Sequence, residues 1–253
     1  MNDGLKGKSI IVTGGASGIG RATAVLLGEA GCNVTIADLR PELGEVVAKE
    51  VCAAGGDARF IRTDVTSEDD ARRMVDAAVS AFGRLDGACN AAGLQSCSKL
   101  VHEMTVEEWD RRIEVNLRGL FLCNKYEIAT MLKENGGSIV NIASSGALAA
   151  FPRGSDYCAA KAGVAGFCRA AALDYATSGI RINAVLPGGT LTPMLREAMK
   201  TDPGLEPAIA AVHPMNRFAQ PNEIGAAIRW LLSDEASFVT GISMPVDGGH
   251  TAV

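Results

Sequence analysis

Two polar side chains are spaced so that they can act together as an acid–base pair. Tyr157 and Lys161 are four residues apart in the stretch SDYCAAKAGVAGF, whose helical pattern puts both side chains on one helix face. A tyrosine with an ordinary pKa of about 10 is a poor base at neutral pH. A neighbouring ammonium and a cationic cofactor ring would stabilise the phenolate and lower that pKa. Tyr157 could then take a proton from an alcohol while a hydride leaves the same carbon.

Two further residues could assist this pair. Ser144 closes the apolar, strand-like run SIVNIASS, and strand ends at the carboxyl edge of such sheets are where chemistry occurs. Its hydroxyl could hold the substrate oxygen, although a turn serine is the alternative. Asn116 lies in the helical stretch RRIEVNLRGLF, where asparagine is a poor helix former. It could interrupt the helical hydrogen-bond ladder to hold a water. Tyr-x-x-x-Lys alone usually marks a surface helix pair, so the combination carries the argument.

A glycine-rich turn near the N-terminus is typical of a dinucleotide site. It connects the apolar run Ser9–Thr13 to a helical pattern and reads Gly14-Gly15-Ala16-Ser17-Gly18-Ile19-Gly20. Such glycines allow a sharp turn, close approach to a pyrophosphate and close helix–strand packing. The helix N-terminus supplies free N–H groups for the phosphates. The position between strand and helix favours binding over a plain connecting turn.

Acidic residues after the next two strands bear on the choice of cofactor. Asp38 stands 18 residues after Gly20, at the end of VTIAD, where it can accept hydrogen bonds from ribose hydroxyls and repel a 2′-phosphate. This favours NAD over NADP, although Arg40 follows the carboxylate and could meet a phosphate. Asp64 could contact an adenine amino group or could simply be a turn residue.

The elements that must position these residues alternate along the chain. Near-continuous apolar runs indicate strands buried on both faces, and amphipathic stretches between them indicate helices. This alternation predicts one α/β domain over residues 1–253, a Rossmann fold with a doubly wound, parallel, seven-stranded sheet and helices on both faces. The expected strands are Ser9–Thr13, Asn33–Ala37, Ala58–Arg62, Leu85–Asn90, Gly137–Ile142, Arg181–Leu186 and Ile242–Val246. The expected helices include Ile19–Ala30, Glu68–Phe82, Thr105–Lys133, Asp156–Ser178 and Pro221–Leu232.

One segment, about residues 188–220, breaks this alternation. It is rich in proline and contains only short helical patterns, Met194–Lys200 and Leu205–Val212. A long insertion after a strand's carboxyl end is where a substrate lid would lie, with an ordinary surface excursion as the alternative. Most candidate lid side chains are apolar: Leu191, Met194, Leu195, Met199, Leu205, Ile209 and Val212.

Composition excludes several other classes of protein. The chain has 253 residues and a net charge of −5, without a basic stripe for nucleic acid. Its first residues lack the pattern of a secretory signal, and no apolar run approaches the roughly 18 residues that span a bilayer. The seven cysteines form no C-x-x-C pair, so reduced thiols are expected rather than disulfides or metal ligands. We therefore expect a cytoplasmic protein without a metal and with neither nucleic acid nor membrane as partner.

Together the motifs resemble the short-chain dehydrogenase/reductase family over essentially the whole chain. The matches are Thr13-Gly14-x-x-x-Gly18-Ile19-Gly20, Asp64, Asn90-Ala91-Ala92-Gly93, Asn116, Ser144, Tyr157-x-x-x-Lys161 and Pro187-Gly188 followed by Thr192. The resemblance implies a catalytic tetrad: Tyr157 as acid/base, Ser144 orienting the substrate oxygen, Lys161 on the nicotinamide ribose and Asn116 holding a proton-relay water. It further implies a homotetramer. The cofactor contacts that it implies, together with the glycine-rich turn, are Gly14, Ser17, Gly18, Ile19, Gly20, Asp38, Asp64, Val65, Asn90, Tyr157, Lys161, Pro187, Gly188, Thr190 and Thr192.

One departure from the family pattern is Ala91, where a second asparagine is usual. The substitution could loosen support behind the catalytic helix, but it removes no reacting group.

The substrate is indicated only by class. The apolar lid candidates favour a small hydrophobic or alicyclic secondary alcohol or its ketone, although these side chains could instead form the core of the lid itself. The stretch GLEPAIAAVHPMNRFAQPNEIGAAIRWLLSDEASFVTG is similar to members acting on cyclohexanols, cyclohexanediols and dihydrodiols. The alternatives are an NADPH-dependent reductase of 3-oxoacyl chains on a carrier protein, and a non-catalytic NAD-binding protein that kept the fold.

Overall fold

A seven-stranded parallel sheet forms the centre of the protein. The computed structural model describes residues 3–134, 136–201 and 204–252. In that part of the chain the strand order is β3-β2-β1-β4-β5-β6-β7, and every neighbouring pair is parallel. The predicted doubly wound sheet is therefore confirmed. The strands are β1 (Ser9–Thr13), β2 (Asn33–Asp38), β3 (Asp57–Arg62), β4 (Gly87–Asn90), β5 (Gly137–Ile142), β6 (Ile180–Pro187) and β7 (Ser243–Val246).

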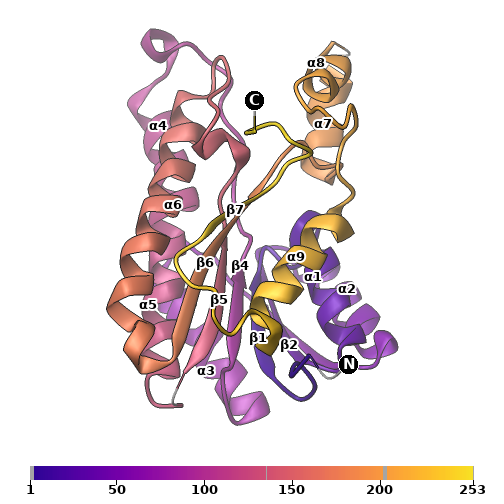
Figure 1. Cartoon of the computed structure of the whole chain (residues 1–253), viewed down its shortest axis with the longest axis vertical. Helices are drawn as coiled ribbons and strands as arrows, with labels where there is room; N and C mark the ends of the chain where they lie inside the picture. The colour runs from indigo at the N-terminus through magenta and orange to yellow at the C-terminus, as the bar shows by residue number, and fades with distance from the viewer. Residues whose placement is uncertain (1–2, 135, 202–203, 253) are drawn as a thin grey trace.

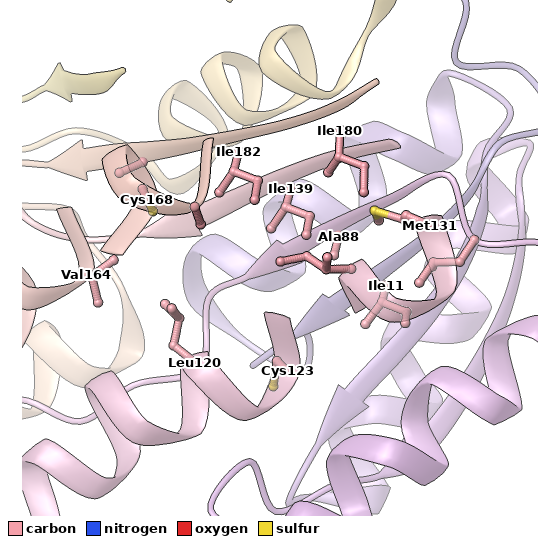
Figure 2. Packing of buried hydrophobic residues seen from close by; sticks show 14 of the residues in the cluster. Ile11, Ala88, Leu120, Cys123, Met131, Ile139, Val164, Cys168, Ile180 and Ile182 are labelled. Atoms are coloured by element: carbon pink, nitrogen blue, oxygen red, sulfur yellow. The ribbon is translucent and has the colours of Figure 1, made fainter. Parts of the chain in front are cut away.

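Helices cover both faces of this sheet (Figure 1). One layer holds α1 (Gly18–Glu29), α2 (Pro41–Ala54) and α9 (Pro221–Leu232), and the other holds α3 (Glu68–Phe82), α5 (Leu120–Met131) and α6 (Ser155–Tyr175). Successive strand residues point into opposite layers: Ile11 packs toward α3 and α5, whereas Ile10 and Val12 pack toward α1 and α9. Figure 2 shows the core between the sheet and the layer of α3, α5 and α6, where Ile139 and Ile182 of the sheet meet Cys168 of α6. Burial on both faces explains the uninterrupted apolar runs.

The helical prediction differs from the structure at two places. The expected continuous helix 105–133 is divided into α4 (Val106–Ile113), a π-helical turn η2 (Glu114–Gly119) and α5. Asn116 lies inside η2. The helical hydrogen-bond ladder therefore changes at the residue where the sequence predicts an interruption. Helix α2 is not among the predicted helices. Its interior Gly44 weakens a local helix signal, but a Cβ at that position would lie 2.1 Å from Cδ2 of Phe60, so tertiary packing requires glycine.

The winding of the sheet reverses direction between β1 and β4. From β1 the chain first extends the sheet through β2 and β3, then returns to place β4 on the other side of β1. Thr13 and Asn90, the last residues of these two strands, are paired in register. In doubly wound sheets, ligands bind beyond the carboxyl ends of strands at such a reversal.

The segment of residues 188–220 leaves and returns to the sheet at one point. Leu191 N donates to Ala219 O at 2.9 Å, and Ala219 N donates to Gly189 O at 2.9 Å. Between these anchors stand α7 (Pro193–Thr201) and α8 (Leu205–Ala211), which project from the carboxyl edge of the sheet in Figure 1. The predicted lid side chains of Met194 and Leu205 lie outside the described part. No helix in the described ranges is both long and apolar enough to cross a membrane.

Candidate active site

Tyr157 and Lys161 lie on the first two turns of α6, on a common face. The Lys161 Nζ is 5.7 Å from the centroid of the Tyr157 ring, and it donates to the Ile142 carbonyl at 2.7 Å. Lys161 is only 4% exposed, because α6 packs its first turns against the end of β5. The four-residue spacing thus brings the pair together as the sequence predicts, while β5 supplies the backbone oxygen that holds the ammonium.

Asn116 reaches the same place from the π-helical turn. Its Oδ1 accepts from Leu94 N at 2.9 Å, and its Nδ2 donates to Leu94 O at 3.0 Å. A Cβ on Gly93 would lie 2.8 Å from Asn116 Oδ1 and 3.6 Å from Lys161 Nζ. Gly93 therefore keeps open the space that borders both side chains, and Asn116 fixes the loop after β4 through both atoms of its amide.

Ser144 stands two residues after β5, with its Oγ accepting from Gly146 N at 3.1 Å. A Cβ on Gly146 would lie 3.3 Å from Ser144 Oγ, 3.1 Å from Phe151 Cε1 and 3.5 Å from Cys158 Sγ. The Phe151 ring centroid is 6.1 Å from that of Tyr157. Glycine at 146 thus preserves room around the serine hydroxyl, where Phe151 and Cys158 form an apolar wall.

Burial sets the protonation of the pair. Burial raises the pKa of Tyr157, and a hydrogen bond with Ser144 opposes that rise. Burial also lowers the pKa of Lys161 to about 8. The lowering of the tyrosine pKa that the sequence predicts is therefore not reached by the protein's own groups. The physical reason is that burial removes water from the phenolate and so disfavours it. The sequence prediction also counted the positive charge of an oxidised cofactor ring, which is not part of the protein.

Asp156, beside the tyrosine, was not among the predicted site residues. It is fully buried, and its carboxylate accepts from Ser96 Oγ at 2.7 Å, from Cys97 N at 2.9 Å and from Tyr157 N at 2.7 Å. Burial by itself would raise the pKa of Asp156, but these hydrogen bonds outweigh it and lower the pKa. Asp156 thus ties the loop after Leu94 to the first turn of α6. Its position next to Tyr157 was the only signal in the sequence.

The glycine-rich turn has the shape that a pyrophosphate requires. Gly14 and Gly18 have φ of +64° and +55°, and a Cβ on Gly14 would lie 2.8 Å from Ala92 Cα. A Cβ on Gly20 would lie 2.3 Å from Gly14 O. Helix α1 begins at Gly18 with no acidic residue in its first turn, and the N-cap Ser17 makes no side-chain capping bond. Ile19 follows on this first turn, so the helix N-terminus offers N–H groups to an anion.

Asp38 ends β2 beside this turn and is 7% exposed. One carboxylate oxygen accepts from Ala16 N at 3.1 Å, and the other accepts from Arg40 N at 3.1 Å and Arg40 Nε at 3.0 Å. Arg40 also donates to Ser17 Oγ at 2.8 Å. The guanidinium therefore lies across the carboxylate and the N-cap serine.

Other predicted cofactor residues lie along the same edge, with different local bonds. Asp64 accepts from Thr66 N at 2.9 Å and Thr66 Oγ1 at 2.7 Å, as a turn residue does. Val65 follows it, and a Cβ on Gly119 of the π-helical turn would lie 3.0 Å from Val65 Cγ2. The Asn90 side chain is buried and bonds to groups in the interior.

Asn90 belongs to a buried polar network that the sequence did not reveal. Its Nδ2 donates to Glu127 Oε2 at 2.9 Å and to Asn141 Oδ1 at 3.0 Å. Asn124 and Asn141 exchange side-chain hydrogen bonds of 3.0 and 3.1 Å. Glu127 is fully buried, and burial raises its pKa to about 7, against the hydrogen bond from Asn90. The network braces the loop in which Ala91 replaces the usual asparagine.

The loop after β6 completes the predicted set. Pro187 and Thr190 are buried, Gly188 and Thr192 are partly exposed, and Thr190 Oγ1 donates to Gly188 O at 3.0 Å. A Cβ on Gly18 would lie 3.2 Å from Thr192 Cγ2, so this loop contacts the glycine-rich turn. The structure therefore gathers the predicted residues along the carboxyl edge of the sheet, from β3 to β6.

A cavity of about 200 Å³ borders the apolar wall. Phe151 and Cys158 line it together with Leu100, Val101 and Ala150, and Lys99 and Arg153 also contribute. Lys99 Nζ is bonded to Glu108 Oε1 at 2.6 Å. Within the described ranges, no group of three or more His, Cys, Asp or Glu residues is arranged to hold a metal ion.

Comparison with known proteins gives a consistent result. Residues 14–251 match the family model described as enoyl-(acyl carrier protein) reductase. A 2,5-dichloro-2,5-cyclohexadiene-1,4-diol dehydrogenase of Sphingobium indicum is 46% identical, with 100% of each chain covered. A cis-4-hydroxycyclohexanecarboxylate dehydrogenase of Sinomonas cyclohexanicum is 43% identical, also with 100% of each chain covered. A cyclohexanol dehydrogenase of an Acinetobacter species is 39% identical, covering 100% of this chain and 98% of the relative.

Solved structures agree with the sequence relatives. The crystal structure of levodione reductase superimposes with a TM-score of 0.95 at 35% identity, covering 98% of this chain and 99% of that one. The family match over almost the whole chain, full-length relatives above 30% identity and the convergent Asn–Ser–Tyr–Lys geometry lead to one assignment. The chain belongs to the short-chain dehydrogenase/reductase family and is an oxidoreductase that acts on CH–OH groups.

Proposed function

We propose that this protein transfers a hydride between NAD and a small alicyclic secondary alcohol or its ketone, with Tyr157 as general acid/base. The observation that carries the proposal is the convergence of Tyr157, Lys161 and Ser144 at the ends of β5 and α6. A non-catalytic NAD-binding protein would not require a buried lysine held beside a tyrosine.

In the direction of oxidation, Ser144 Oγ holds the substrate hydroxyl and Tyr157 Oη takes its proton. Lys161 keeps a positive charge near the phenolate, and its bond to the Ile142 carbonyl fixes that charge in place. Asn116 holds the Leu94 backbone, and the neighbouring Gly93 leaves open the space next to Lys161 Nζ where a relay water would stand. A bound dinucleotide would supply its nicotinamide ring as the hydride acceptor.

The glycine-rich turn fits a dinucleotide, because side chains at Gly14 or Gly20 would close it. Gly18, Ile19 and the α1 N-terminus would hold the pyrophosphate, Asp38 the adenosine ribose, and Lys161 the nicotinamide ribose. Asp64, Val65 and the Asn90 backbone would border the adenine side, while Pro187, Gly188, Thr190 and Thr192 would border the nicotinamide.

NAD over NADP is favoured by the charge that Asp38 puts at the ribose. A 2′-phosphate would approach a buried carboxylate whose oxygens already accept from Ala16 and Arg40. Arg40 cannot bind the phosphate without losing its paired hydrogen bonds to the Asp38 carboxylate. Ribose hydroxyls, in contrast, can donate to the same carboxylate.

A cyclic substrate is supported by two observations. The wall formed by Phe151 and Cys158 beside Ser144 is apolar, and relatives named for cyclohexanol and for cyclohexadienediol share the full length of the chain. We propose that the segment 188–220 forms the lid over this substrate, since its two ends are anchored together at the site.

We further propose a homotetramer in the cytoplasm. Leu173 of α6 and Phe121 of α5 are strongly exposed, and Phe238 and Ile242 are exposed before β7. Exposed apolar side chains of this size favour contacts between copies. All seven cysteines are free thiols and all lie in the described part, which supports a reducing compartment.

Initial rates with NAD and NADP on cyclohexanol, cyclohexanediols and linear secondary alcohols test the proposal. We expect NAD-dependent turnover of the cyclic alcohols, and a loss of at least about 100-fold in kcat in Tyr157→Phe. Turnover that survives in Tyr157→Phe would contradict the mechanism. A strong preference for NADPH with 3-oxoacyl substrates would instead favour the reductase of 3-oxoacyl chains on a carrier protein.

A further inference from the structure

His213, two residues after the end of α8, is buried among lid and sheet-edge residues and is 4% exposed. Both ring nitrogens are engaged. Nδ1 is 2.6 Å from Ile209 O, and Nε2 is 2.9 Å from Gly189 N. The side chain thus connects the lid helix to the loop after β6 through two backbone groups that face opposite sides of one ring.

These partners determine where the ring carries its proton. The Ile209 carbonyl can only accept, so Nδ1 donates to it, and the Gly189 N–H can only donate, so Nε2 accepts from it. The neutral imidazole with its proton on Nδ1 satisfies both bonds at once. A side chain with an acceptor at the Nε2 position could replace the bond to Gly189, whereas an apolar side chain could not.

The ring is seated directly on the two glycines of the loop. A Cβ on Gly188 would lie 2.6 Å from His213 Nε2, and a Cβ on Gly189 would lie 3.2 Å from His213 Cε1. Only residues without side chains admit the ring at this distance. The histidine and the glycine pair are therefore one packing unit.

On its other side, His213 meets the C-terminal tail. The His250 ring centroid is 5.2 Å away at 47°, and His250 Nδ1 is 3.2 Å from Ser145 Oγ, next to Ser144. In Figure 1 this tail passes between the α7–α8 segment and the upper end of α6. Asp247, the nearby carboxylate, is engaged by Gly249 N, Thr251 N and Thr251 Oγ1. The contacts link the loop after β6 to the catalytic-serine loop through two histidines.

We infer that His213 is a positioning residue for the cofactor loop, and that His250 couples this loop to the loop of Ser144. The inference rests on the proposed function, because Gly188–Thr190 is the loop proposed to border the nicotinamide. His213 does not touch reacting atoms. It fixes Gly189 so that the loop is already in place before the dinucleotide binds, which removes an ordering cost from binding.

The test compares His213→Leu, which lacks the acceptor, with His213→Gln, whose Oε1 can accept from Gly189 N–H. His102→Leu, an exposed histidine outside the lid, is the matched control. Amide hydrogen exchange of a peptide covering residues 186–192 needs no cofactor. We expect exchange of this peptide to rise about tenfold in His213→Leu, and to stay within about threefold of wild type in His213→Gln and His102→Leu.

Fluorescence titration with NADH gives the second readout. We expect the Kd to rise about tenfold in His213→Leu and to recover in His213→Gln, with no change in His102→Leu. Unchanged exchange and unchanged Kd in His213→Leu would overturn the inference, even if its melting temperature fell. Failure of wild type to bind NADH would refute the proposed cofactor, while the exchange result would still decide whether His213 holds the loop.

A double-mutant cycle between His213→Leu and His250→Ala in kcat/KM tests the coupling to the serine loop. Effects that multiply to within twofold of the double variant would remove His250 from the inference.

Discussion

Because Glu127 is fully buried, we expect the free energy of unfolding to fall as pH rises. Its Oε2 accepts from Asn90, and its Oε1 has no hydrogen-bond partner within the described part of the chain. Burial raises the pKa from 4.5 to about 7. Between these two values the folded protein binds a proton that the unfolded chain has lost, so the free energy of unfolding falls as pH rises through this window. At about 1.4 kcal/mol per pH unit, the full effect is roughly 3 kcal/mol, of which about 2 kcal/mol falls between about pH 5.5 and about pH 8.5.

Urea unfolding of wild type and Glu127→Gln at both pH values, at one protein concentration, measures this effect. The neutral amide in this variant does not titrate, so the variant should gain about 2 kcal/mol relative to wild type on going from about pH 5.5 to about pH 8.5. Glu223→Gln is the control. The hydrogen bond from Arg217 lowers the pKa of Glu223 to about 2, so its contribution is present above about pH 4.5 and is lost only as pH falls below that.

The outcome that refutes the reasoning is a difference between wild type and Glu127→Gln that is the same at both pH values to within about 0.5 kcal/mol. Glu127 would then keep one charge state in the folded and unfolded chain, and burial at α5 would not control its proton.

Three further predictions concern the cofactor site and assembly. Asp38→Ala should lower the ratio of kcat/KM for NAD over NADP by at least about tenfold, because the carboxylate is lost and Arg40 is released; an unchanged ratio in initial-rate assays would contradict the role of Asp38. Gly14→Ala should weaken NADH binding at least about tenfold with unchanged circular dichroism, because φ at Gly14 is +64° and a Cβ there would meet Ala92. Equal Kd values for the variant and wild type would argue against dinucleotide binding by the glycine-rich turn. Leu173→Glu combined with Phe238→Glu should shift sedimentation from tetramer to smaller species, since both side chains are more than four-fifths exposed; an unaltered profile would place the interface elsewhere.

Local sequence determined the elements and the chemistry that they carry. Runs such as IIV before Gly14 are apolar because their strands are buried on both faces, and that property is visible without any knowledge of the fold. The spacing of Tyr157 and Lys161 is likewise a local matter, because one helix places residues four apart on one face. Asn116 signalled a disturbed helix, and the π-helical turn is there. Helix α2 was missed because Gly44 is explained only by Phe60 of another element.

Tertiary structure alone decided which groups are desolvated and which partners they meet. Nothing near Glu127 in the sequence says that its carboxylate is sealed against Asn90, 37 residues away. The rise in the Tyr157 pKa, the bond from Lys161 to Ile142 and the two bonds of His213 depend in the same way on elements distant in the chain. Periodicity and motif spacing follow from covalent geometry over a few residues, whereas burial and partner choice arise only when strands and helices close around one another.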